Sequence, residues 1–318
     1  MAEEQAPSQS GAAYWPGQNL ENRVVRSAIF LPVIALLVAA SPAMPAENVG
    51  AVTIMEGDAV AIRGLYKFGL ARGVRMKGDD LVETGKAGFV RIEFFDGSQV
   101  NLGPSTRLQL NRPSLRRFDR PTLYLLSGWL KVGAGKAPEG APVSLSSPPL
   151  DVLDLSGSAV VRIESGEVAV FAESGPLRLI DRRARPTTLS VKSGHFVALQ
   201  AGEAPRVERA APPDFVSAMP RLYMDQIPPE IEHVKEVAAK PLGTFTYNEV
   251  EAWLNAEPAI RRRFIVDWAA KAEDPAFRDR LETRLAQHPE WEKVLYKDRP
   301  DARTGATPHQ VVSTPETR

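Results

Sequence analysis

Carboxylates are the side chains of this sequence with the clearest potential for chemistry. Asp79, Asp80 and Asp96 could belong to a calcium site, which needs several oxygen ligands converging at about 2.3–2.6 Å. They lie in short glycine-containing stretches, "KGDD" and "FDGS", and Asp favours turns because its side chain bonds nearby backbone groups. We therefore predict turn residues here rather than metal ligands.

A second set of acids has the spacing of a glycosidase only at first sight. Glu164, Glu167 and Glu173 could supply the two carboxyl groups, about 5–9 Å apart, that glycoside hydrolysis needs. In "RIESGEVAVFAES", however, they alternate with apolar residues. This pattern predicts the solvent-facing side of strands and not a catalytic pair.

Histidine and cysteine offer little more. The four histidines (His195, His233, His288 and His309) have no i, i+4 partner, and the chain has no Cys. A zinc site or a catalytic triad would need such partners. We find no phosphate-binding loop, nucleophile elbow or dinucleotide fingerprint either. The sequence predicts a protein that is not an enzyme and that uses no cofactor or metal.

Aromatic and basic residues are the remaining candidates, for binding rather than catalysis. Tyr124 and Trp129 could stack on a sugar, and Trp253 could form a docking ridge for another protein. Apolar spacing also fits Trp129 and Trp253 as core residues, so both alternatives stay open. Arg261 and Arg262 could contact a partner or form a solvated helix face.

Composition limits the class of partner. The 318 residues contain 39 basic and 39 acidic side chains, so no net charge favours nucleic acid. Arg23 and Arg26 precede "SAIFLPVIALLVAA", an apolar run of about 14 residues, within the range of a secretory signal. We predict that residues 1–43 are an N-terminal extension plus a signal peptide cleaved after Ala43, or alternatively an inner-membrane anchor. The expected location is the periplasm.

Residues 49–207 show a period of two rather than 3.6. Val90, Ile92 and Phe94 alternate with Arg91 and Glu93, which predicts strands with one buried face and one wet face. Turn signals recur about every 8–12 residues, which is typical of an all-β sandwich, barrel or solenoid. We expect a mainly β domain of short strands stacked as a solenoid or sandwich.

"FDGS" is the most informative turn of this domain. A three-residue loop of Asp96, Gly97 and Ser98 would pair Phe94 with Val100 and Ile92 with Leu102, which keeps one face apolar. We therefore predict a bulged three-residue turn, with Gly97 or Ser98 at positive φ.

The pattern changes after the β domain. Residues 208–244 are proline-rich and read as a linker wrapping the domain. Residues 245–298 predict a small helical domain: Thr246 and Glu249 form a capping box, and Pro258 and Pro275 suit first helical turns. Residues 299–318 are polar and predict a disordered tail.

The central stretch resembles the FecR domain family. The resemblance covers about residues 50–207 and rests on the stretches "GDDLVETG", "DGS" and "LGPST". The matching turn residues are Gly78, Asp79, Gly85, Asp96, Gly97, Ser98, Gly103 and Pro104. The resemblance implies a periplasmic all-β domain, and well-understood members of the family control a sigma factor through an N-terminal domain. Here only 26 residues precede the apolar run, too few to fold as such a domain.

These observations favour a non-catalytic periplasmic FecR-like binding or signalling module that contacts an envelope protein of the outer or inner membrane. The alternative is a cell-envelope structural protein that binds cell-wall glycan.

Overall fold

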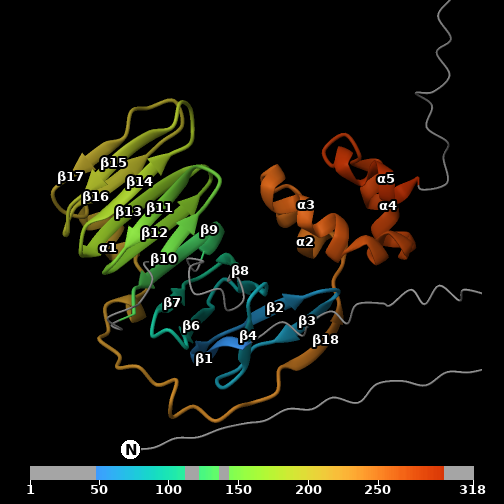
Figure 1. The fold of residues 1–318 in the computed structure, drawn as a ribbon, viewed down its shortest axis with the longest axis horizontal. Helices are drawn as coiled ribbons and strands as arrows, with labels where there is room; N and C mark the ends of the chain where they lie inside the picture. The colour runs from blue at the N-terminus through green and yellow to red at the C-terminus, as the bar shows by residue number, and fades with distance from the viewer. Residues whose placement is uncertain (1–47, 112–121, 136–142, 297–318) are drawn as a thin grey trace, which may run out of the picture. The chain divides into compact units, whose positions relative to one another are not determined.

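The computed structural model describes residues 48–111, 122–135 and 143–296, which belong to one compact unit. Strands occupy the chain up to Glu208, and α2–α5 follow near its C-terminal end (Figure 1). The predicted class, mainly β followed by helices, is confirmed. The predicted signal segment (1–43) and the predicted tail from residue 299 lie outside the described residues.

The strands form two sheets that share one long strand, β9 (Thr122–Gly133). Sheet A has the following order: β4 (Arg75–Lys77), β1 (Asn48–Glu56), β6 (Phe89–Phe94), β7 (Gln99–Leu102), β9, β12 (Ser158–Glu164), β13 (Glu167–Ser174), β16 (Phe196–Leu199) and β17 (Arg206–Glu208).

Sheet B has the following order: β18 (Lys240–Thr244), β3 (Tyr66–Gly69), β2 (Ala59–Arg63), β5 (Leu81–Thr84), β8 (Arg107–Asn111), β9, β10 (Val143–Ser146), β11 (Leu150–Leu155), β14 (Leu177–Asp181) and β15 (Thr187–Val191). The β9–β10 pair is parallel, and the other described pairs are antiparallel.

Strand β9 changes sheet at Gly128. Its residues up to Ser127 pair with β8 of sheet B, and its residues from Gly128 onward pair with β12 of sheet A. Gly128 has φ +99°, and a Cβ there would lie 2.4 Å from the Cα of Thr106. The strand can therefore bend at this point only because the residue has no side chain.

A continuous apolar core lies between the two sheets. Sheet A contributes Val52, Ile92 and Val170, and sheet B contributes Val82 and Leu108, all fully or almost fully buried. The alternation predicted from the sequence therefore places the expected apolar residues in the core. The architecture is a two-sheet sandwich, one of the two arrangements that we expected.

The β6–β7 hairpin differs from the predicted register. Ile92 pairs with Val100, and the loop closes with Phe94 N donating to the carbonyl of Ser98 at 2.9 Å. The three-residue loop therefore begins at Phe95, one residue earlier than predicted. Its last residue is Gly97 at φ +81°, which confirms the expected positive φ. This bulged turn requires positive φ at its third loop position, and Gly97 adopts it without strain.

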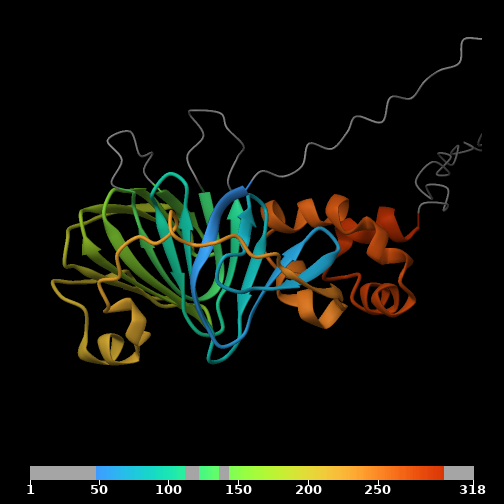
Figure 2. The same ribbon diagram turned by 90° about the horizontal axis from the view of Figure 1, so that it is seen from below.

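Residues 209–239 connect β17 to β18, and we call them the strap. The strap contains α1 (Pro213–Ala218) and a 3₁₀ turn (Arg221–Tyr223), and it crosses the strands of sheet A (Figure 2). Strand β18, at the end of the predicted linker, pairs with β3. The proline-rich segment is therefore partly regular structure.

The C-terminal helices begin where the sequence places them. They are α2 (Tyr247–Leu254), α3 (Pro258–Asp267), α4 (Pro275–Thr283) and α5 (Glu292–Leu295), with 3₁₀ turns at Ala269–Glu273 and Pro289–Trp291. The predicted capping box of Thr246 and Glu249 is present. Asp274 caps α4 by accepting from Ala276 N and Phe277 N.

Candidate functional site

The most elaborate polar site of the described residues is built on β6. All six residues of this strand are buried, although only three of them face the core between the sheets. Arg91 and Glu93 alternate with those core residues, and each has 3% of its surface exposed. The prediction that this face of β6 is exposed to solvent is therefore wrong. The strap covers this face, and period-two alternation in the sequence does not reveal such a cover.

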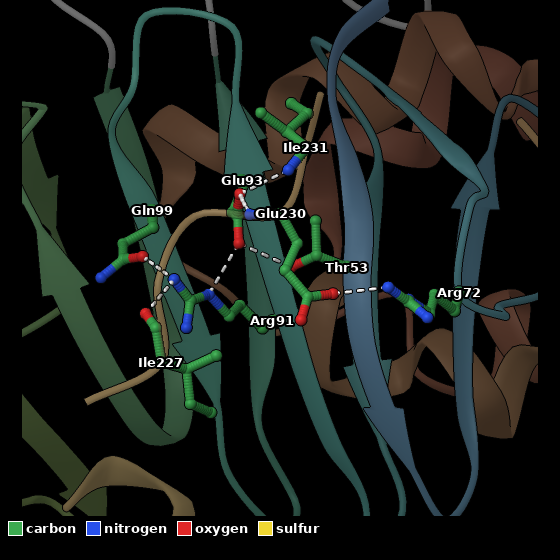
Figure 3. A network of polar contacts seen from close by, with 8 residues as sticks. All are labelled: Thr53, Arg72, Arg91, Glu93, Gln99, Ile227, Glu230 and Ile231. Atoms are coloured by element: carbon green, nitrogen blue, oxygen red, sulfur yellow. Dashed lines mark hydrogen bonds and ion pairs between the residues drawn. The ribbon is translucent and has the colours of Figure 1, made fainter. Parts of the chain in front are cut away.

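Glu93 uses both carboxylate oxygens (Figure 3). Its Oε1 accepts from Thr53 Oγ1 at 3.0 Å and forms an ion pair with Arg91 Nε at 3.0 Å. Its Oε2 accepts from the successive backbone N–H groups of Glu230 and Ile231, at 2.8 and 2.9 Å. One buried carboxylate on β6 therefore binds β1, its own strand and the strap.

Arg91 completes the network from the opposite side. Its Nη2 donates to Gln99 Oε1 on β7 and to the carbonyl of Ile227 in the strap at 3.1 Å. A buried charge is tolerated when it is paired and hydrogen-bonded in this way. Because the contacts of Glu93 and Arg91 join strands to the strap, the pair acts as a clamp. A carboxylate so occupied could serve as a base only if the strap moved away.

Tyr223 forms a second attachment of the strap. Its hydroxyl lies 2.8 Å from the carbonyl oxygens of both Asn101 and Trp129, and burial raises its pKa well above the ordinary value. Lys131 Nζ donates to the carbonyl of Tyr223 at 2.6 Å. In addition, Phe215 of α1 contacts the ring of Trp129, with centroids 5.2 Å apart. The strap is thus held at three points along sheet A.

Helices α2–α5 cover the part of the outer face of sheet B that β2, β5 and β9 form, by a different chemistry. Their buried rings form one cluster with three sheet residues, Ile62, Leu81 and Tyr124. The rings of Phe264 and Trp268 are stacked, with centroids 4.1 Å apart and an interplanar angle of 7°. This apolar contact fixes the helices to the sandwich.

Charged contacts surround that cluster. Trp253 Nε1 donates to Glu83 Oε1 on β5 at 2.6 Å, and Arg107 lies 3.5 Å from the same carboxylate. Burial raises the pKa of Glu83, while the hydrogen bond from Trp253 and the charge of Arg107 oppose this rise. Arg182 joins Asp151 to Glu257 in the loop before α3. These groups fix the direction in which the helices dock.

The predicted turn residues hold turns, and one acid of the set does more. Asp96 Oδ1 accepts from the backbone N and Oγ of Ser98, at 2.9 and 2.6 Å. Gly78 and Asp79 form the turn after β4. Asp80, 1% exposed, instead forms a two-pronged ion pair with Arg63, with both distances at 2.7 Å. Nothing in "KGDD" distinguishes Asp80 from its neighbour, so sequence reasoning missed this pair.

The other turn glycines separate into two kinds. Gly85 N donates to the carbonyl of Asp58 at 2.8 Å and so joins the β5 end to a neighbouring turn. Gly103, next to Pro104, lies where a Cβ would approach Pro220 Cγ to 2.8 Å and Trp129 Cβ to 2.9 Å. Gly103 therefore leaves space for the strap, a role that the sequence does not reveal.

The structure corrects most of the predicted partner surface. Tyr124 is 2% exposed and Trp253 is fully buried, so neither ring can contact a partner or a glycan. Trp129 is partly covered by Phe215 and by Arg162, whose guanidinium lies 5.3 Å from the ring centroid.

The two predicted arginines differ from each other. Arg261 is largely covered and pairs with Glu290 at 3.0 Å. Arg262, on the same helix, is exposed. Of the predicted surface residues, Arg262 alone has a side chain that is largely open to solvent.

Three further observations concern the described residues. Glu164, Glu167 and Glu173 are exposed on β12 and β13, as predicted. Within the described ranges, no three His, Asp or Glu side chains are grouped so that they could hold a metal ion. A cavity of about 370 Å³ lies at the starts of α2 and α4, but both helices are capped there by the chain's own side chains.

Comparisons with known proteins return distant structural neighbours. No protein-family model matches the chain, and no curated protein matches it. Two crystal structures of a protein from Parabacteroides distasonis ATCC 8503, provisionally described as an anti-sigma factor, are similar at 14% and 12% sequence identity. Each has a TM-score of 0.36, and the match covers 41% of this chain and 59% of that one. This similarity is too low to assign a family.

Helix length gives one further observation. In the described ranges, no helix is both long enough and apolar enough to cross a membrane. The apolar run before Ala43 lies outside those ranges.

Proposed function

We propose that this protein is a non-catalytic, FecR-like binding or signalling module of the periplasm, which contacts a protein partner in the cell envelope. The clamp of Arg91 and Glu93 carries the proposal. Its charged atoms are used to fasten the chain's own strap across sheet A. A fold whose buried charges join distant segments of the chain provides a rigid scaffold, and such scaffolds suit the presentation of a surface to a partner.

Export is the first part of the proposal, and it rests on the basic flank and apolar run near the N-terminus. N-terminal sequencing of the protein from fractionated cells tests it. We expect a periplasmic protein that starts at Met44. A full-length chain recovered with the cytoplasm would contradict export.

A photo-crosslinking residue at an exposed position tests the partner. Val266 on α3 is 80% exposed, and Arg262 lies one turn before it. We expect a discrete adduct with one envelope protein from such a position and none from Trp253, which is buried in the same helical cluster. Turnover of a glycan or peptide substrate by the purified chain, together with no adduct, would contradict the proposal.

Glycan binding, the alternative that the sequence left open, loses support from the structure. Sugar stacking needs an open aromatic face, whereas Tyr124 is buried and Trp129 is covered by Phe215 and Arg162. We expect the protein to stay in the supernatant when isolated peptidoglycan is sedimented. Co-sedimentation that isolated glycan fragments compete away would favour the alternative.

A further inference from the structure

Sheet edges are the places where a sandwich can accept another strand, and natural proteins usually blunt them. Three of the four edges of the described sheets are blunted. Strand β4 has three residues, and Val74 beside it bridges to Val237 of the strap. Strand β17 has three residues, and its Arg206 and Glu208 pair with each other. Strand β18 contains Pro241 and a register shift.

Strand β15, at the fourth edge, has none of these protections. Its five residues pair with β14 in unbroken register, and no charged residue or proline lies between Thr187 and Val191. On its other side it meets no strand among the described residues, and it lies at the border of sheet B (Figure 1). Thr187, Thr188 and Ser190 are exposed. A regular, uncharged edge of this kind is a template for strand addition.

The ends of this edge carry positive charges that no described acidic residue pairs with. The stretch "RRARPTTLSVK" contains four basic residues and no acid. Arg182 and Arg183 are used in ion pairs with Asp151, Glu257 and Asp181. Arg185 and Lys192 are exposed and form no ion pair with any described residue. They flank β15 and lie about 23 Å apart if the seven steps between them are extended.

The loop before this edge is fastened to the rest of the sandwich by Arg183. Arg183 donates to the carboxylate of Asp181 and to the backbone carbonyls of Gln200 and Glu203. These contacts fix the loop before β15 to the turn after β16. A strand that is already ordered loses little conformational entropy when another strand pairs with it.

We propose that β15 is a docking strand for an extended acidic segment of a partner protein, which adds to the edge of sheet B. The backbone of β15 supplies the hydrogen bonds, while Arg185 and Lys192 select acidic side chains at the two ends. This inference rests on the proposed binding function and names its site. Charge complementarity distinguishes this occupant from a second copy of the chain. In a two-fold antiparallel pairing centred on Leu189, Arg185 of each copy would lie opposite Ser193 of the other and Lys192 opposite Pro186, so a second copy would supply no acid to either charge.

Peptide binding to the full chain tests the proposal. The probe is a fluorescein-labelled peptide, Glu-Val-Thr-Val-Thr-Val-Thr-Glu, whose glutamates are spaced like Arg185 and Lys192. The comparison peptide has lysine at both ends. We expect saturable binding of the acidic peptide by fluorescence anisotropy, weaker at high salt, together with new hydrogen-exchange protection at the β15 amides. Equal binding of both peptides, or protection elsewhere but not in β15, would overturn the proposal.

Charge reversal gives the matched variant. The double variant Arg185→Glu with Lys192→Glu should bind the acidic peptide about tenfold more weakly, since two exposed ion pairs each contribute up to about 1 kcal/mol. The same variant should bind the lysine peptide better. Arg209→Glu with Lys235→Glu changes the net charge equally at exposed positions of the strap and should leave both affinities unchanged. An equal loss in both double variants would show a non-specific charge effect and overturn the proposal.

Photo-crosslinking in cells separates this inference from the proposed function. An envelope protein captured from Thr188 supports the docking strand. An envelope protein captured from Val266 but never from Thr188 would contradict the docking strand and leave the binding function standing. Capture of a second copy from Thr188 would overturn the choice of occupant. No capture from any exposed position would contradict the binding function, and the peptide measurement would then decide on β15 alone.

Discussion

The covers on the outer faces of the two sheets differ in how far they use buried polar contacts. On sheet A, a strap with little regular structure is fastened by a buried ion pair and by backbone contacts to Glu93 and Tyr223. On sheet B, short helices cover the sheet through a cluster of stacked and edge-on aromatic rings. The strap therefore combines directional polar contacts with the packing of Phe215 on Trp129 and Phe196, whereas the helical cover depends mainly on the area of apolar surface removed from water.

The difference has consequences for stability and for positioning. A buried ion pair contributes little net stability, because desolvation offsets the attraction, but the loss of one partner is costly. Apolar burial is non-directional and contributes roughly in proportion to area. We infer that the clamp of Arg91 and Glu93 sets where the strap lies, whereas the aromatic cluster supplies the stability that holds the helices.

Truncation of the aromatic cluster should have the largest effect. Trp253→Ala removes a fully buried ring and leaves Glu83 without its indole donor, so we expect a loss of about 4 kcal/mol in the free energy of unfolding. Urea denaturation measures it. Hydrogen exchange should then show lost protection in α2–α5 but not in the strap. Val266→Ala, at a position 80% exposed, is the control and should change stability by less than about 0.5 kcal/mol. Equal losses in the strap would show that the two covers are not independent.

Neutralising the clamp should cause the next largest loss in the free energy of unfolding. Hydrogen-exchange protection should then be lost in the strap and not in the helices. Glu93→Gln leaves Arg91 buried without its counter-charge, so we expect a loss of about 3 kcal/mol and faster exchange of the amides of Glu230 and Ile231. Protection in α2–α5 should stay unchanged. Glu173→Gln, which alters an exposed pair with Lys131, should cost less than about 1 kcal/mol.

A double variant tests the balance within the clamp. Arg91→Leu combined with Glu93→Leu removes both charges, and it should be less destabilising than Glu93→Gln because no unpaired charge remains. A double variant that is much less stable than the single one would show that the pair itself is strongly stabilising, contrary to our comparison.

The bend in β9, which belongs to both sheets, should show an intermediate effect. Gly128→Ala places a Cβ 2.4 Å from the Cα of Thr106 at φ +99°, and we expect a loss of about 2–3 kcal/mol. Gly166→Ala is the matched control, since Gly166 also has positive φ but has nothing within 4 Å. It should cost about 1 kcal/mol in thermal or urea unfolding. Equal losses of stability at both sites would mean that the loss at Gly128 comes from backbone strain and not from the crowding where β9 changes sheet.

The sequence predicted more of the fold than of the candidate site. Alternation in β6 correctly selected Ile92 for the core, and the capping box correctly placed the start of α2. The same alternation gave the wrong environment for Arg91 and Glu93, because a period of two separates the faces of a strand without showing what covers either face. The cover comes from residues more than 130 positions later, and contacts of that range leave no local signal.

The register of the β6–β7 hairpin shows a second limit. Shifting the pairing by two residues keeps every side chain on the same face, so the apolar pattern could not distinguish Phe94 opposite Val100 from Ile92 opposite Val100. The requirement for positive φ at Gly97 decides between them, and it depends on the geometry of the loop. The buried pair of Asp80 with Arg63 was missed for a similar reason, since a turn residue and an ion-pair residue look alike in "KGDD".

The smallest expected effect concerns Glu83, the buried carboxylate of β5 that accepts from Trp253 at the aromatic cluster. Burial raises the pKa of Glu83 in the folded protein, against the hydrogen bond from Trp253 and the charge of Arg107. The folded state therefore binds the proton more tightly than the unfolded chain. The contribution of Glu83 to stability should fall as pH rises from the ordinary value of 4.5 to the raised value, and this contribution should stay level above that window. Glu83→Gln should remove this slope in urea titrations at several pH values, while Glu164→Gln, on the exposed face of β12, should keep it. A slope unchanged in Glu83→Gln would assign it to another group, such as Asp267 on α3, whose pKa is also raised by burial.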